Sequence, residues 1–119
     1  ALPPRVAAAV GDLAADLAAA PYAAPEAHRL RELGLGTREL ATAVRLGALT
    51  RVADGVYLAP AAVQRAHEPL RDLPQPFTLA DARRAWGTTR RVAVPLLELL
   101  DAEGRTRRLP DDRRVVTAD

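Results

Sequence analysis

Apolar residues recur at helical spacing over the first 47 residues of the chain. Residues 4–19 carry them at i, i+4, i+7 and i+11, which is one face of a helix: Val6, Val10, Leu13 and Leu17. We expect this helix to stop at Pro21 and a short extended piece to follow over residues 21–24. A second helix is predicted from Pro25 to Leu33, because proline suits a first helical turn and Gly34 can end the helix. A third is predicted through Gly47, with Thr37 as its capping residue.

A β-hairpin is predicted directly after these helices. Two β-prone runs, residues 49–53 and 56–59, flank the pair Asp54-Gly55. An Asp-Gly pair between such runs favours a tight type I′ turn, because glycine accepts a positive φ angle. We expect Tyr57 to pack across this hairpin.

The second half of the chain repeats this order of elements. A helix is predicted from Pro60 to Leu73, and a short extended break follows. Thr78 and Asp81 form the pattern of a capping box for a helix that ends at Trp86. A longer helix should begin at Thr88 or Thr89 and end before Gly104, with a kink at Pro95. A second hairpin should then turn at residues 110–112.

The order helix, short strand, helix, helix, hairpin therefore occurs twice. This is the plan of the winged helix, in which a helix-turn-helix is followed by a β-hairpin wing. We predict a mostly α chain with small β-hairpins (α+β), built from two tandem winged-helix modules at residues 1–59 and 60–119. A rigid junction is expected, because Ala59-Pro60 joins wing to helix without a flexible linker.

The composition offers little for catalysis. The chain has no Cys and two His residues, which lie far apart in sequence, so neither a disulfide nor a clustered metal site is expected. No nucleophile with a base, carboxylate pair or phosphate loop is present. We expect no enzymatic activity, no metal and no cofactor, in a cytoplasmic monomer that does not bind membranes. His28 and His67 are expected on the solvated surface, and Phe77 and Trp86 in the core.

Charge is distributed unevenly along the chain. All seventeen basic residues are Arg. Residues 1–73 hold eight Arg and eight acidic residues, whereas residues 74–119 hold nine Arg and seven acidic residues. These nine lie in three groups: Arg83-Arg84, Arg90-Arg91, and the arginines between Arg105 and Arg114. For Arg83-Arg84, a solvated face balanced by acids explains the pattern equally well.

The other two groups point to an anionic partner. Arg90 and Arg91 follow a turn at a helix N-terminus, where free N–H groups and the helix dipole already favour phosphate. Two cations at this end are unfavourable for the helix itself, so we expect an anion to dock nearby. The hairpin arginines cluster on one wing, and we expect part of that set to project beside Arg90 and Arg91. Charge and fold together favour nucleic-acid binding.

At this point the residues resemble a known family. The segment from Phe77 to Asp101 is similar to the last winged helix of bacterial selenocysteine-specific elongation factors (the SelB family). The most specific run is Gly-Thr-x-Arg-x-x-Ala-x-Pro-Leu-Leu-Glu-x-Leu-Asp, followed by Thr-Arg-Arg, which covers Gly87 to Arg108 and includes Pro95. Residues 52–60 resemble the wing of the preceding module. The second wing departs from the family, since Pro110-Asp-Asp-Arg stands where a Gly-Asp-Lys-type turn is frequent.

The resemblance implies a role in selenocysteine incorporation. Such factors are GTPases that deliver selenocysteinyl-tRNA to the ribosome, and their C-terminal winged helices bind a messenger RNA hairpin, the SECIS element. This chain carries no GTPase motif, so its partners would be the hairpin and, through the parent factor, the ribosome. By this analogy the third-helix start and the wing of the second module face the RNA. The expected RNA-binding residues are Thr88, Thr89, Arg90, Arg91, Arg107, Arg108, Arg113 and Arg114.

Two other functions stay open for a winged helix. It can bind duplex DNA as a transcription regulator, or it can serve as a protein–protein interaction module. A DNA reader would be expected to carry Arg, Asn or Gln along the exposed face of its third helix. Here the exposed positions after Arg91 are expected to be acidic, namely Glu98, Asp101 and Glu103. That pattern favours contact through the helix tip and the wing.

Overall fold

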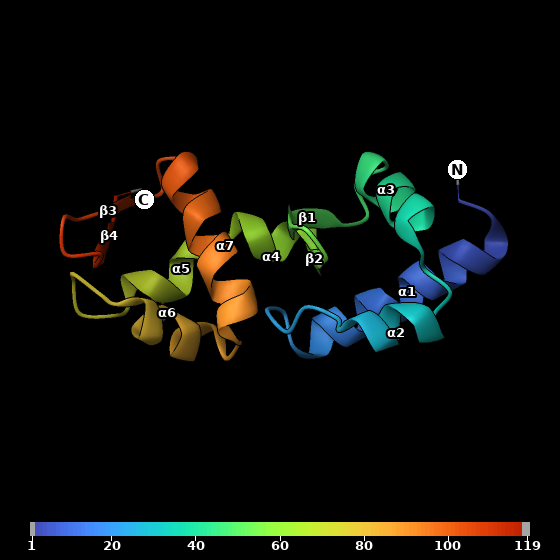
Figure 1. Ribbon diagram of the computed structural model, residues 1–119, viewed down its shortest axis with the longest axis horizontal. Helices are drawn as coiled ribbons and strands as arrows, with labels where there is room; N and C mark the ends of the chain where they lie inside the picture. Colours follow the sequence, from blue (N-terminus) through green and yellow to red (C-terminus); the bar gives the residue numbers. More distant parts are fainter. Residues whose placement is uncertain (1, 118–119) are drawn as a thin grey trace. The chain divides into compact units, whose positions relative to one another are not determined.

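The computed structural model describes residues 2–117, which divide into two compact units, one up to Val63 and one from Gln64 onward. The division lies within helix α4 (Pro60–Gln64) rather than at Ala59-Pro60. The start of α4 belongs to the first unit because the Tyr22 hydroxyl donates a hydrogen bond to the carbonyl of Ala62 at 2.9 Å. Each unit combines helices with one two-stranded antiparallel hairpin, the α+β winged-helix plan (Figure 1).

The helices of unit 1 are close to those predicted. Helix α1 (Pro4–Ala19) has the expected bounds, and the four apolar positions of its predicted face are buried. Helix α2 (Ala27–Glu32) is shorter than expected, since it begins at Ala27, after the N-cap residue Glu26, rather than at Pro25. Helix α3 (Thr37–Arg45) begins at Thr37, so this residue is not the cap. Gly36 takes that position, and its N–H donates to Glu39 Oε1 at 3.0 Å.

The hairpin of unit 1 pairs β1 (Thr50–Ala53) with β2 (Val56–Leu58). Gly55 has a φ of 73°, whereas Asp54 is not among the residues with positive φ. A type I′ turn needs positive φ at both central residues, so that prediction is wrong. The pairing register shifts between Arg51 and Ala53, and this irregularity accommodates the different turn. Tyr57 is buried, as expected for a residue that packs on the hairpin.

Unit 2 begins where a single helix was expected from Pro60 to Leu73. The structure instead has two short helices, α4 and α5 (His67–Arg71). Pro69 explains the break, because its ring lacks an N–H and would clash with the carbonyl four residues earlier, that of Arg65. That carbonyl accepts the N–H of Glu68 at 3.0 Å, a tighter turn than an α-helix makes.

Helices α6 (Leu79–Trp86) and α7 (Arg90–Ala102) form the helix-turn-helix of unit 2. The predicted capping box is confirmed, because Thr78 Oγ1 accepts the Asp81 N–H and Asp81 Oδ2 accepts the Thr78 N–H. Gly87 ends α6 in the left-handed conformation. Helix α7 includes Pro95, although the kink expected there stays a prediction.

The core of unit 2 lies between these helices and the hairpin. Phe77 and Trp86 are buried, as expected, and the Trp86 indole N–H donates to the carbonyl of Ala66 at 2.9 Å. The side of α7 facing this core contributes five buried apolar residues: Val92, Ala93, Leu96, Leu97 and Leu100. Among residues 2–117, no helix is long and apolar enough to cross a membrane.

The hairpin of unit 2 pairs β3 (Thr106–Arg108) with β4 (Arg114–Val116). Its turn falls at residues 110–112 as predicted, and Asp112 takes a φ of 71°. Phe77 adds a third short extended segment, because its backbone exchanges two hydrogen bonds with Arg114, at 2.8 and 2.9 Å. The hairpin is therefore attached to the segment that leads into α6.

Candidate nucleic-acid interface

The first turn of α7 presents two of the expected arginines. Thr89 is the N-cap residue in extended conformation, and its side chain makes no capping hydrogen bond. Arg90 and Arg91 open the helix, both are exposed, and no acidic residue lies in this turn. The positive end of the helix dipole thus coincides with two guanidinium groups, and this combination attracts an anion.

Arg90 differs from most other arginines of unit 2 in its surroundings. Among residues 2–117 its guanidinium has no acidic partner within ion-pair distance, and Thr89 beside it is exposed. Thr88 is half-buried, and its N–H donates to the carbonyl of Arg83 at 3.1 Å, which closes the turn between α6 and α7. The turn is therefore fixed by the backbone, while Arg90 is available to a ligand.

The hairpin of unit 2 exposes three further arginines. Arg107 pairs across the strands with Val115, and Arg113 lies two residues before Val115, so Arg107 and Arg113 share one face. Arg108 lies on the other face. Arg107 resembles Arg90, because it too has no acidic partner among the residues that the structure describes.

Two hairpin arginines are paired with the acidic residues of their own turn. Arg108 Nη2 lies 3.0 Å from Asp112 Oδ1, and Arg113 Nε lies 2.8 Å from Asp111 Oδ2. The backbone N–H of Arg113 also donates to Asp111 Oδ1 at 3.1 Å. These hydrogen bonds from the Arg113 backbone and side chain lower the pKa of the Asp111 carboxyl group, which favours its charged form.

Arg114 is buried, which contradicts its expected position at the RNA-binding surface. Its side chain is 7% exposed, and its guanidinium donates to both carboxylate oxygens of Asp101, at 2.9 to 3.1 Å. Thr106 Oγ1 donates to the same carboxylate at 2.6 Å. Arg114 faces inward because it pairs with Arg108 on the hairpin face that also carries the buried Thr106. It joins the hairpin to α7 and is not presented to a ligand.

The two exposed arginine groups are separated along α7. Arg90 is its first residue, whereas the hairpin follows its last turn, where Asp101 holds Arg114. A helix of 13 residues is about 20 Å long. Figure 1 shows the start of α7 (lighter orange) and the β3–β4 hairpin (red) at different ends of the helix. The expectation that hairpin arginines project beside Arg90 and Arg91 is therefore wrong.

His67 contacts Arg105 and is buried, instead of lying on the solvated surface. His67 is 4% exposed, which contradicts the expected surface position, whereas His28 is exposed as expected. Arg105 Nη1 lies 3.0 Å from His67 Nδ1 and 3.2 Å from the carbonyl oxygen of Gln64, to which it donates. Burial, reinforced by the positive charge of Arg105, lowers the pKa of His67. Because Arg105 is always a donor, Nδ1 of the neutral imidazole accepts its hydrogen bond.

Arg83 and Arg84, the remaining arginine pair of unit 2, lie in two different environments. Arg84 is exposed, and its Nη2 lies 2.8 Å from Asp81 Oδ1 one turn earlier in α6. Arg83 is half-buried. Arg84 thus fits a balanced solvated face.

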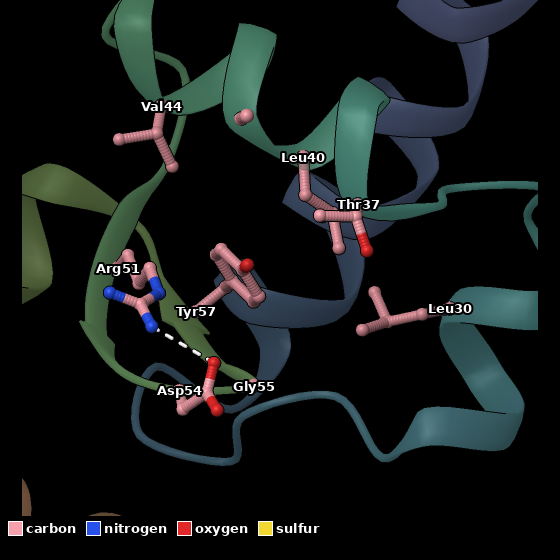
Figure 2. A pocket seen from close by; sticks show the side chains of 9 residues that line it. Leu30, Thr37, Leu40, Val44, Arg51, Asp54, Gly55 and Tyr57 are labelled. Carbon is pink, nitrogen blue, oxygen red and sulfur yellow. Dashed lines mark hydrogen bonds and ion pairs between the residues drawn. The ribbon is translucent and has the colours of Figure 1, made fainter.

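Unit 1 has a groove of about 510 Å³ between α3 and its hairpin (Figure 2). Its walls are largely apolar, with Leu40 and Val44 on one side and Tyr57 on the other. The basic residue in the lining is Arg51, and its Nη2 lies 2.9 Å from Asp54 Oδ1, drawn as a dashed line in Figure 2. A polyanion would find little positive charge in this groove, so unit 2 remains the candidate interface.

A metal site requires a cluster of suitable ligands. Within the part of the chain that the structure describes, no three His, Asp or Glu residues are grouped so that they could hold a metal ion. Thr89, Arg90 and Arg107 are exposed hydroxyl and guanidinium donors, and such groups bind phosphate oxygens.

Comparison with known proteins finds a family match within unit 2 and a structural match over both units. Residues 69–115 match the family described as "Elongation factor SelB, winged helix". The search of curated proteins found no match. Among solved structures, a bacterial selenocysteine-specific elongation factor EF-Sec matches with a TM-score of 0.66 and 21% sequence identity. The match covers 89% of this chain and 18% of that one, so the fold of both units recurs within a much longer protein. Over residues 69–115 the second unit is therefore similar to the winged helix of elongation factor SelB.

Proposed function

We propose that unit 2 binds an RNA hairpin and thereby tethers a selenocysteine-specific elongation factor to its messenger RNA at the ribosome in the cytoplasm. In this proposal the chain is a non-catalytic RNA-binding part of a GTPase. The contacts come from the first turn of α7, with Thr89, Arg90 and Arg91, and from the exposed face of the β3–β4 hairpin.

One observation carries the proposal. In the unit that matches the SelB family, Arg90 and Arg107 are exposed and have no acidic partner among residues 2–117. Desolvating a guanidinium group is worthwhile only when an anion is gained, so exposed and unpaired arginines are suited to phosphate. Arg108 and Arg113 can join them once their exposed ion pairs open, because such pairs contribute little stability.

The spacing of these groups suits RNA better than a DNA groove. Only the first turn of α7 is basic, and its later exposed positions include Glu98. A whole helix inserted into a major groove would bring that carboxylate close to phosphates. Contacts at both ends of α7 can instead bracket a hairpin whose loop bases are unstacked and readable.

The decisive experiment compares three nucleic acids: an RNA hairpin, its stem duplex alone, and a DNA hairpin of the same length as the RNA hairpin. Affinities are measured by fluorescence anisotropy at several salt concentrations. We expect the RNA hairpin to bind best, with a log–log salt slope of about −3 to −4, corresponding to about four phosphate contacts. Equal affinity for DNA and RNA hairpins would support the transcription-regulator alternative. Binding to none of the three would support a protein interaction module.

A further inference from the structure

The turn of the β3–β4 hairpin carries its own competing anions. Asp111 and Asp112 pair with Arg113 and Arg108, and all four side chains are about half exposed or more. Arg107 lies within the same hairpin and has no such partner among residues 2–117. The hairpin therefore presents one available guanidinium group and two that are already bound.

We propose that Asp111 and Asp112 are specificity determinants that make the hairpin discriminate between a shape-matched RNA and other polyanions. This inference rests on the proposed RNA-binding function and adds a selection step to it. The two carboxylates hold Arg113 and Arg108 away from a loosely placed phosphate, and they release them to a phosphate that is positioned to replace the carboxylate.

The physical basis is the difference between a fixed and a fluctuating phosphate. A flexible polyanion that approaches Arg113 also meets the charge of Asp111, whose Oδ2 lies 2.8 Å from Arg113 Nε, so attraction and repulsion largely cancel. An RNA anchored elsewhere, at Arg90 and Arg107, brings its phosphates to the turn at high effective concentration. The exposed ion pairs then open at small cost.

The turn geometry allows the charges to be removed without removing the turn. Asp111 Oδ1 accepts the Arg113 N–H at 3.1 Å, and the amide oxygen of asparagine can accept the same hydrogen bond. Asp112 has a φ of 71°, a conformation that asparagine also adopts readily. Asp111→Asn and Asp112→Asn are therefore near-isosteric neutralisations. Asp112→Gly is a second way to remove that charge at the same φ.

The test measures the affinity of the whole chain for the RNA hairpin and for a single-stranded RNA of scrambled sequence and equal length. For the double Asn variant, the scrambled RNA should bind about three- to tenfold more tightly and with a steeper salt slope, because two guanidinium groups become available. The hairpin should gain less than about threefold, so the ratio of the two affinities falls. Asp12→Asn, an exposed charge of α1 in unit 1, is the matched control and should leave the ratio unchanged.

The outcomes separate this inference from the proposed function. If the wild-type chain prefers the hairpin and the folded double variant keeps the wild-type ratio, the aspartates do not select and the inference fails alone. If the ratio rises, the inference is overturned as well. If the wild-type chain shows no preference for the hairpin, the proposed function fails first. Thermal melts of each variant confirm that the turn still folds.

Discussion

Arg114 and Asp101 form the ion pair that fixes the hairpin of unit 2 to helix α7. Three hydrogen bonds of 2.9 to 3.1 Å join the guanidinium to the carboxylate, and the arginine side chain is 7% exposed. The neighbouring Arg113 is exposed and pairs only within its own turn. Two adjacent residues, the last before β4 and the first of that strand, thus have different roles, one at the surface and one in the fold.

The first prediction separates these roles. Arg114→Ala should lower the free energy of unfolding by roughly 2 kcal/mol, because it leaves Asp101 without its partner. This value is below that of a fully buried pair, since the Asp101 side chain is 24% exposed. Arg113→Ala should leave stability nearly unchanged but weaken hairpin binding. Urea unfolding and RNA titration of both variants check this, and equal stability of the two would contradict it.

The second prediction concerns the first turn of α7. Arg90→Ala should weaken binding of the RNA hairpin by roughly 1–3 kcal/mol, because it removes a charge-assisted contact. Its melting temperature should stay the same or rise slightly, since a cation is unfavourable at a helix N-terminus.

Arg45→Ala is the control for this prediction. Arg45 is exposed in the last turn of α3 in unit 1, where a cation suits the helix dipole. Its removal should leave hairpin affinity unchanged at one fixed salt concentration. If Arg45→Ala is the damaging change and Arg90→Ala binds normally, the site lies in unit 1 and the assignment is wrong.

The third prediction is a pH dependence of stability that arises from His67. Burial, then the charge of Arg105, then that of Arg71 lower its pKa from the usual value of 6.5, while Glu68 and Glu103 act in the opposite direction. The folded state therefore binds this proton less readily than the unfolded state. The free energy of unfolding should have its full value above about pH 6.5, and it should fall as the pH drops through the lowered pKa of His67 in the folded state.

Urea unfolding between pH 7.5 and pH 5 measures this effect. His67→Gln should flatten the decrease, because glutamine cannot gain the charge while its amide oxygen can still accept from Arg105. His28→Gln, at an exposed position, should retain the decrease. A wild-type profile that stays flat over this range would refute the role of His67.

The fourth prediction tests the junction between the helices of unit 2. Trp86→Phe should lower the free energy of unfolding by about 1–2 kcal/mol, because the carbonyl of Ala66 loses its buried donor. Circular dichroism melts provide the measurement, since the substitution removes the only tryptophan and its fluorescence. RNA affinity at a temperature where both proteins are folded should not change. A variant as stable as the wild type would show that the hydrogen bond contributes nothing.

The local signals in the sequence were sufficient for the order of most elements, although the helix expected over residues 60–73 is two helices, α4 and α5. Helix α1 was predicted at about its observed bounds, because its apolar spacing and Pro21 act within one or two turns. The capping box of Thr78 and Asp81 is equally local, since both hydrogen bonds join residues three positions apart. The resemblance of the segment after Gly87 to the SelB family is supported by the match over residues 69–115.

The burial of individual charged residues was decided only by the tertiary structure. Asp101 and Arg114 are 13 residues apart, and His67 and Arg105 are 38 apart, so no periodicity within one element links them. The pattern placed Arg114 and His67 on the surface because charged and imidazole groups are usually solvated. In the folded chain a charged or imidazole side chain is buried where a residue of a distant element supplies its hydrogen-bond partner. Tertiary contacts also distinguish the available arginines, Arg90 and Arg107, from the paired ones. The sequence determines which charges exist. The packing of α7 against the hairpin decides which of those charges are exposed to a ligand.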